Sequence, residues 1–311
     1  MLYFKRDQNK RIVSRVRILI GICTYNRPEM LVDAIDSIKA MSVKPSAIVV
    51  CDNSADKTAQ DSVMGTDDVV YLHCPDQGVS NARNIVVEYA LEHEYDFLAF
   101  IDDDEIVSVD WLQSYIDVLK SHQVDFACGP VFPIIDDDRS NIGWLQTTGF
   151  YSPPLRETGM LPPSSIVGCG NVIIDLKYLR AHPVRFDPKF NRSGGEDAVF
   201  FYFLQKEGAR GYWVSSAIVD ERLEECRYSF KYFVKRSYGL ANAGTQAHSV
   251  VYGWWKSFFL VGPKAITHMF FAVGLGTIGL IRKRYLYRGI RHCCIGWGQI
   301  CGLLFIRSEN Y

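Results

Sequence analysis

The sequence lacks the features that mark several common protein classes. Its nine cysteines are odd in number and form no C-x-x-C pair, which argues against a zinc site or a disulfide framework and favours a reducing compartment. Lys and Arg number 34 against 35 Asp and Glu, so no basic excess indicates nucleic acid as a partner. Met1–Arg17 is polar and basic without an apolar core, so we expect no signal peptide. No internal repeat is visible.

What the sequence does contain is enough apolar material for a large core. Of its 311 residues 48% are hydrophobic, which fits one large domain or two small ones and excludes a disordered chain. The charge is unevenly distributed, because residues 251–311 carry eight Lys or Arg and one Glu, whereas residues 1–250 carry 26 basic and 34 acidic residues. An acidic body with a basic, apolar tail is typical of a soluble domain attached to an anionic surface.

The first half of the chain alternates strand-like and helix-like segments. Short apolar runs read as strands, and between them apolar residues recur at helical spacing after Pro28 and Ser80. The apolar runs are Ile18–Cys23, Ala47–Cys51, Val69–Leu72 and Phe97–Ile101. This order predicts an α/β fold with a Rossmann-like, mostly parallel sheet flanked by helices. In such sheets ligands bind beyond the carboxyl ends of the strands.

Less regular structure is predicted after this region. Residues 132–165 are rich in proline and glycine and are too long for a plain connector, so we interpret them as a binding loop or lid. Further strands are predicted at Val167–Ile174 and Tyr212–Val219, with a helix at Glu196–Gln205 between them.

Two apolar stretches near the C-terminus flank a basic run at residues 282–292. Ala265–Ile281 has 17 residues and Cys293–Ile306 has 14, both short of the ~20 that a comfortable transmembrane helix needs. We interpret them as an interfacial or re-entrant helical hairpin with its basic link at the cytoplasmic headgroups. The alternative is a pair of buried core helices or a dimer interface.

This interpretation divides the chain in two. Residues 1–245 are expected to form a catalytic domain, and residues 246–311 a hydrophobic helical tail for membrane association or homodimerisation. We therefore expect a cytoplasmic protein that is peripheral or monotopic at the inner face of the cell membrane.

Polar and acidic residues follow three of the predicted strands, at Thr24–Arg27, Asp52–Ser54 and Asp102–Glu105. Adjacent acids repel one another unless a cation is present. Asp102 and Asp104, two apart on an extended chain, would point the same way. Hard ions such as Mg²⁺ or Mn²⁺ prefer oxygen ligands, so the cluster predicts a divalent-cation site. The alternative is a solvated acidic turn.

Six segments in sequence order resemble the motifs of family 2 glycosyltransferases. They are Ile20–Pro28, Asp52–Ser54, Gly78–Asn84, Phe100–Glu105, Gly168–Asn171 and Gly194–Asp197. The resemblance covers roughly residues 17–240 and extends to bacterial exopolysaccharide enzymes of the succinoglycan type. It implies a GT-A fold, a nucleotide-sugar donor, a divalent metal and transfer with inversion.

On the donor side, the resemblance implies a role for each motif residue. The residues it places around the nucleotide-sugar are Thr24, Asn26, Arg27, Asp52, Arg83, Asp102 and Asp103. Asp52 would hold the base, and Asp102 the ribose or a metal-bound water. Asp104 would ligate the Mg²⁺ or Mn²⁺ ion. The second-strand acid is commonly paired with uracil, which favours a UDP-sugar and leaves TDP- and GDP-sugars open.

On the acceptor side, the resemblance makes Asp197 the general base that takes the proton of the attacking hydroxyl. Glu196 would act beside it on the acceptor. Further acceptor-binding residues are predicted to be Gly170, Asn171 and Trp144. Many enzymes of this fold supply a His metal ligand where this sequence has Val219–Arg222, so Glu221 is either a substitute ligand or a surface partner of Arg222.

Together these features predict a metal-dependent glycosyltransferase that acts on a membrane-associated, lipid-linked glycan in polysaccharide biosynthesis. One alternative is a nucleotidyltransferase of the same fold, against which the glycine-free turn Thr24–Pro28 argues. Another is a degenerate scaffold protein, against which Asp102, Asp104 and Asp197 argue, because a scaffold needs no convergent acids.

Overall fold

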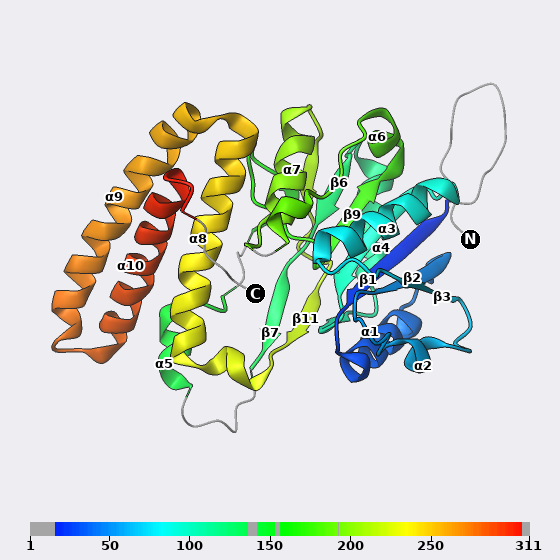
Figure 1. Ribbon diagram of the computed structural model, residues 1–311, viewed down its shortest axis with the longest axis horizontal. Helices are drawn as coiled ribbons and strands as arrows, with labels where there is room; N and C mark the ends of the chain where they lie inside the picture. Colours follow the sequence, from blue (N-terminus) through cyan, green and yellow to red (C-terminus); the bar gives the residue numbers. More distant parts are fainter. Residues whose placement is uncertain (1–15, 136–141, 153–155, 192, 307–311) are drawn as a thin grey trace.

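The computed structural model of the protein describes residues 16–135, 142–152, 156–191 and 193–306. Most of Met1–Arg17, where we expected no signal peptide, therefore lies outside the described residues. A twisted central sheet carries helices on both faces, and three long helices stand beside it (Figure 1). The predicted α/β fold is confirmed.

The central sheet has the strand order β3-β2-β1-β4-β9-β6-β10-β8. Its strands are β1 (Ile18–Thr24), β2 (Ala47–Asp52), β3 (Val69–His73), β4 (Phe97–Asp102), β6 (Phe126–Cys128), β8 (Gly159–Met160), β9 (Asn171–Asp175) and β10 (Gly211–Trp213). The first four strands are parallel, as predicted. The sheet becomes mixed because β9 runs antiparallel to both β4 and β6.

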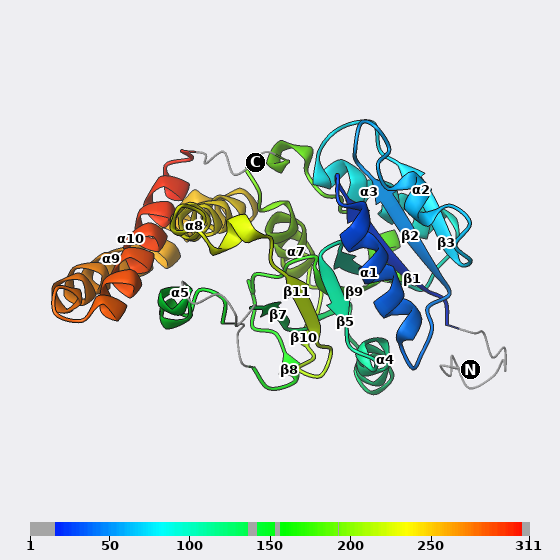
Figure 2. The ribbon, with the colours of Figure 1, turned by 90° about the horizontal axis from the view of Figure 1, so that it is seen from below.

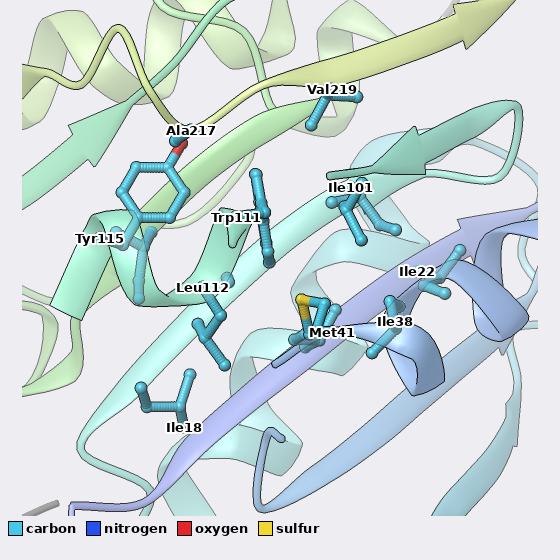
Figure 3. Close-up of a cluster of buried hydrophobic side chains, with 14 of the residues drawn as sticks. Ile18, Ile22, Ile38, Met41, Ile101, Trp111, Leu112, Tyr115, Ala217 and Val219 are labelled. Carbon is cyan, nitrogen blue, oxygen red and sulfur yellow. The ribbon is translucent and has the colours of Figure 1, made fainter. Parts of the chain in front are cut away.

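Side chains alternate along the strands between two cores. Ile18, Ile20 and Ile22 of β1 face one core, and Leu19 faces the other. The first core is covered by α1 (Pro28–Ala40) and α4 (Trp111–Ser121), and its side chains interdigitate in Figure 3. The second core is covered by α3 (Val79–Glu92), α6 (Leu176–Ala181) and α7 (Glu196–Lys206). The short helix α2 (Gln60–Val63) follows β2.

A second sheet beside the carboxyl edge differs from the prediction. It has the order β5-β11-β7, and its strands are β5 (Glu105–Val107), β7 (Val131–Ile134) and β11 (Val219–Arg222). The strand predicted at Tyr212–Val219 is therefore broken, with its two ends in different sheets. β9 begins only at Asn171. The segment 132–165 contains part of β7, α5 (Gly143–Thr148) and β8, and its residues 136–141 and 153–155 lie outside the described chain.

Two 3₁₀ turns and three long helices complete the chain. The turns are η1 (Pro188–Phe190) and η2 (Glu225–Tyr228), and the helices are α8 (Phe230–Tyr252), α9 (Trp254–Gly279) and α10 (Lys283–Leu303). α9 has 26 residues, longer than the apolar stretch predicted there, and is long and apolar enough to cross a membrane. Residues 283–292 form the first half of α10 and not a link, and residue 245 lies within α8.

The three long helices form one layer in which α10 lies against both α8 and α9 (Figures 1 and 2). Small residues on α10 permit this close approach. A Cβ added at Gly298 would lie 2.4 Å from the carbonyl oxygen of Tyr238 on α8, and one at Gly296 would lie 3.0 Å from that of Ala265 on α9. Helices that pack with their backbones this close form a rigid unit.

Asn171 fastens β9 to its surroundings. Its Nδ2 donates to the carbonyl oxygens of Pro130 (2.9 Å) and Ala217 (2.8 Å). Its Oδ1 accepts from Trp111 Nε1 at 2.8 Å and from the Tyr115 hydroxyl at 2.5 Å. The residue is 3% exposed. This side chain therefore satisfies four buried polar groups from three parts of the chain.

Replacing Asn171 by Ala should destabilise the protein strongly. The Trp111 Nε1–H and the Ala217 carbonyl lose their described partner, whereas the Pro130 carbonyl keeps the Val219 N–H and the Tyr115 hydroxyl keeps the Asn171 carbonyl. Each buried polar group left without a partner costs about 1–3 kcal/mol, so we expect the free energy of unfolding to fall by about 2–6 kcal/mol in urea denaturation. Gln113→Ala is the control, since Gln113 lies on α4 with Trp111 and makes only an exposed bond to Asp117. It should change stability by less than about 0.5 kcal/mol. Equal stability of the two variants would contradict the role of Asn171.

Candidate active site

Three strands of the central sheet end at the same edge. Register pairs Thr24 of β1 with Asp52 of β2, and Cys23 with Asp102 of β4. The polar residues that follow the three strands are therefore brought together, as the sequence predicted.

The acidic segment after β4 does not continue as an extended strand. The chain turns after Asp102, so the side chain of Asp102 is 44% exposed while that of Asp104 is 5% exposed. The two residues therefore do not follow one another on the extended backbone that the sequence predicted. Glu105 turns back beneath them, and its Oε2 accepts from the Asp102 backbone N–H at 2.7 Å. A Cβ on Gly170 would lie 2.3 Å from Glu105 Oε1, so Gly170 makes room for this buried acid.

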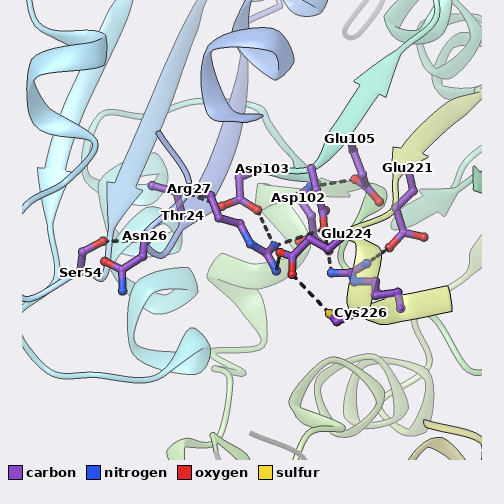
Figure 4. Close-up of polar contacts among 12 residues, drawn as sticks. Thr24, Asn26, Arg27, Ser54, Asp102, Asp103, Glu105, Glu221, Glu224 and Cys226 are labelled. Atoms are coloured by element: carbon purple, nitrogen blue, oxygen red, sulfur yellow. Dashed lines mark hydrogen bonds and ion pairs between the residues drawn. The ribbon is translucent and has the colours of Figure 1, made fainter. Parts of the chain in front are cut away.

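Two arginines, Arg27 and Arg227, surround Asp104. Figure 4 shows Arg27 beside Glu224. The Oδ2 of Asp104 lies 3.2 Å from Arg27 Nη1 and 2.8 Å from Arg227 Nη2. Arg27 also contacts Glu224 at 2.6 Å, and Arg227 pairs with Glu221. The predicted pair between Glu221 and Arg222 does not form, since Arg222 binds Asp33.

Asp103 is turned inward from the same segment. It accepts from Thr24 Oγ1 at 2.7 Å and from Arg27 Nη1 at 3.2 Å. Burial raises the pKa of Asp103 to about 6, against the opposing charge of Arg27. The hydrogen bond from Thr24 to Asp103 thus holds the acidic turn against β1.

A second arginine centre joins the strand edge to α7. Arg83 of α3 is buried, and its Nη1 lies 2.6 Å from Glu196 Oε1 while its Nη2 lies 3.3 Å from Asp102 Oδ1. The other oxygen of Glu196 is buried and has no hydrogen-bond partner among the described residues. Arg83 is therefore engaged by protein carboxylates on both sides of the site.

Asp197 follows Glu196 in the first turn of α7 and lies beside Gly168, where an added Cβ would be 3.4 Å from its Oδ2. Burial, and then the charge of Glu196, raise the pKa of Asp197 to about 7. A carboxyl group with this pKa can accept a proton near neutral pH, as a general base must.

The site holds more carboxylates than guanidinium groups. Burial raises the pKa of Asp104, Glu105 and Glu221, and the charges of neighbouring acids add to the effect. Mg²⁺ in phosphate-binding sites is held by one or two carboxylates and takes its other ligands from waters and phosphates. The oxygen ligands suit such an ion, which would be held by Asp104 together with Asp102 or Glu221. Among the described residues no three His, Cys, Asp or Glu side chains form a preassembled metal site.

Asp52, the residue predicted to hold the base, is fully buried. Its Oδ1 accepts from the Ser54 N–H and its Oδ2 from the Ala59 N–H, both at 2.9 Å. Asn26 has a left-handed backbone (φ 56°) and donates its N–H to Ser54 Oγ. Asp52 thus fixes the loop after β2. Asn26, which follows β1 and is exposed, is joined to that loop by its hydrogen bond to Ser54.

Two predicted acceptor residues have other surroundings. The ring of Trp144 contacts the rings of Phe230, Phe233 and Tyr287, so it joins α5 to α8 and α10. Asn171 has its hydrogen bonds in the core. Trp144 therefore packs in an aromatic cluster and Asn171 serves the core, and their roles at the acceptor stay predictions.

Sequence reasoning missed Arg227 and Glu224. They belong to no motif of the resemblance, and Arg227 is 123 residues from its partner Asp104. The only local signal is the alternation of acids and arginines in the segment 221–227.

Comparison with known proteins agrees with this geometry. Residues 19–171 match the family model described as Glycosyl transferase family 2. The succinoglycan biosynthesis protein ExoM of Rhizobium meliloti is 29% identical over 316 residues, which cover 95% of this chain and 96% of that protein. The glucosyl-dolichyl phosphate glucuronosyltransferase of Haloferax volcanii is 29% identical over 121 residues, 37% of each chain.

Solved structures share the fold. Crystal structures of S. aureus TarS residues 1–349 superpose with a TM-score of 0.53 at 13% sequence identity, over 92% of this chain and 91% of that one. The set includes complexes with UDP and with UDP-GlcNAc. The likeness establishes a GT-A-like α/β fold for this protein.

The buried pair between Arg83 and Glu196 should be essential for stability. Arg83→Gln leaves two carboxylates without their cation, and loss of one partner of a buried pair typically costs about 3–5 kcal/mol. The matched control is Arg185→Gln, whose pair with Glu88 has the same 2.6 Å separation but exposed side chains, at 29% and 51%. It should cost less than about 1 kcal/mol. Chemical denaturation that gave equal losses would contradict the assignment.

Proposed function

Because residues 19–171 match the model of glycosyl transferase family 2, we propose that this protein transfers a sugar from a nucleoside-diphosphate sugar to a hydroxyl group, with inversion. One observation carries the proposal. Arg83 ties Asp102, at the strand edge where a donor would bind, to Glu196, next to the candidate base Asp197. The two sides of a transfer site are thereby held at a fixed separation.

The proposed reaction is a single displacement. The acceptor oxygen bonds to the anomeric carbon while the bond from that carbon to the phosphate oxygen breaks, and its electron pair leaves with the nucleoside diphosphate. The acceptor proton passes to a carboxylate oxygen of Asp197. Glu196 orients the acceptor from the same helix turn. A divalent ion held by Asp102 and Asp104 would neutralise the charge that develops on the diphosphate.

We propose a UDP-sugar as donor. Support comes from the TarS structures that contain UDP and UDP-GlcNAc. For the acceptor we propose a lipid-linked glycan in polysaccharide biosynthesis. Support comes from the names of two relatives, a succinoglycan biosynthesis protein and a transferase that acts on a glucosyl-dolichyl phosphate.

We further propose that the tail, α9 and α10, docks on an anionic membrane. A stripe of exposed apolar side chains runs along α9 at helical spacing. It comprises Trp255, Phe259, Ile266, Phe270 and Val273, which are 58–74% exposed. At its end Leu280 and Ile281 are also exposed, and the basic residues Arg282, Lys283 and Arg284 follow. Apolar residues flanked by basic ones suit a helix that lies in the interface of an anionic membrane.

Asp197→Asn should separate binding from catalysis. We expect transfer to fall by about 10²–10⁴-fold, because the base is lost, while the thermal shift with UDP and Mn²⁺ stays as in the wild type. The wild-type rate should rise with pH through about 7, as Asp197 loses its proton. Asp61→Asn, an exposed acid in the first turn of α2, is the control.

Two results would count against this assignment. Full transfer by Asp197→Asn would exclude Asp197 as the base. A wild-type protein that is folded but shows no thermal shift with any nucleoside diphosphate, with or without Mn²⁺, would favour a degenerate scaffold instead.

The docking proposal predicts that charges in the apolar stripe abolish vesicle binding. The double variant Phe259→Glu/Phe270→Glu should no longer sediment with vesicles of anionic phospholipid. The control Met160→Glu/Ile166→Glu alters residues exposed to 56% and 69% outside the tail and should sediment like the wild type. If the stripe variant still sediments, or if it instead converts a dimer to a monomer without lipid, docking through this stripe is wrong.

A further inference from the structure

We propose that Arg227 is an exchangeable counter-ion. In the described structure it neutralises Asp104 and Glu221, and it moves to the diphosphate when a nucleoside diphosphate binds with a divalent ion. The inference rests on the proposed function, since it takes a nucleoside diphosphate as the ligand.

The first support is the geometry at Asp104. Arg227 uses Nη2 for Asp104 and Nη1 for Glu221, so both of these nitrogens are bound by carboxylates that sequence reasoning placed at a metal. The side chain of Asp104 is 5% exposed and that of Arg227 is 17% exposed. The guanidinium groups of Arg27 and Arg227 both lie on Oδ2 of Asp104, so a cation that binds this oxygen competes with them.

The second support is the place of Arg227 in the chain. η2 is a four-residue turn between β11 and α8, and its backbone N–H groups bond locally, as the Arg227 N–H does to the Glu224 carbonyl oxygen. Contacts to the rest of the site come from side chains. Arg27 reaches Glu224, and the Tyr151 hydroxyl donates to the Arg227 carbonyl at 2.8 Å. A turn held by ion pairs can exchange them without breaking a sheet.

The third support is charge. A divalent ion and a guanidinium group at the same carboxylate repel each other, so they compete for Asp104. A diphosphate reverses this competition, because it offers oxygens to both cations, and a guanidinium group binds phosphate with paired hydrogen bonds. Arg227 then leaves Asp104 for the phosphate, and Asp104 becomes available to the metal ion.

This exchange has a definite thermodynamic sign. The nucleotide should strengthen metal binding, and the metal should strengthen nucleotide binding by the same factor. Removing Arg227 should act in opposite directions on the two ligands alone. Mn²⁺ by itself should bind more tightly because its competitor is gone, and UDP should bind less tightly because a phosphate partner is gone.

Calorimetry on the full-length protein tests the exchange, with Mn²⁺ alone, UDP alone and UDP in the presence of Mn²⁺. In Arg227→Gln we expect the dissociation constant for Mn²⁺ to fall several-fold and that for UDP to rise by about tenfold or more. Uridine, which has no phosphate, should bind as in the wild type. Arg227→Lys keeps the charge and should retain part of the UDP affinity, and it also serves as the test if the Gln variant fails to fold.

The control is Arg222→Gln, five residues earlier, whose ion pair with Asp33 lies at the surface. It should behave like the wild type with all three ligands. If Arg227→Gln binds both Mn²⁺ and UDP like the wild type, or if both affinities change in the same direction, the exchange is wrong and the proposed function stands. If the wild type binds no nucleoside diphosphate even with Mn²⁺, the proposed function itself fails.

Discussion

The buried guanidinium group of Arg83 is the contact on which the rest of the site depends. It comes from α3, and it holds an acid from the end of β4 and an acid from the start of α7 in a single ion-pair centre. Both elements pack in the second core, and Arg83 adds the polar link between them at the candidate site. Burying that charge is tolerable only because two carboxylates accompany it. Burial and then the charge of Glu196 raise the pKa of Asp197, and the charge of Arg83 opposes them.

The sequence predicted the strands and helices better than it predicted the directions of side chains. Alternating and helical periodicities located the first four strands and the helices between them, because burial on both faces of the sheet leaves a clear pattern. Asp102 and Asp104 were placed correctly in the chain, but their directions follow from a turn that periodicity does not encode. Asn171 lies in the expected motif, yet its hydrogen bonds go to residues as distant as Ala217. Ion pairs such as Arg227 with Asp104 connect distant segments and leave no local signal.

Hydropathy also located the C-terminal tail, but the bounds that it predicted for the two helices there were wrong. A helix continues as long as its backbone hydrogen bonds do, whatever the polarity of its side chains. The basic residues after residue 282 therefore form the start of α10. Arg288 and Arg291 donate to the carbonyl oxygens of Thr147 and Thr148 at the end of α5, which gives these charges partners inside the protein. Apolar content alone began the second predicted helix at Cys293, after these charges, whereas α10 begins at Lys283.

The tail is joined too closely to the site to be a separate anchor. Gly195, the residue before Glu196, has a left-handed backbone, and a Cβ added there would lie 3.1 Å from the Cβ of Ala243 on α8. α7 and α8 also share a small core that includes Val199, Tyr202 and Ala247. The helix α7, which presents Asp197, therefore rests on α8. The helix α10 of the tail packs on α8 as well. A membrane that fixes α9 would fix the orientation of Asp197 as well, because close-packed helices move together. In this architecture the surface proposed to bind lipid and the edge proposed to bind the acceptor belong to one body.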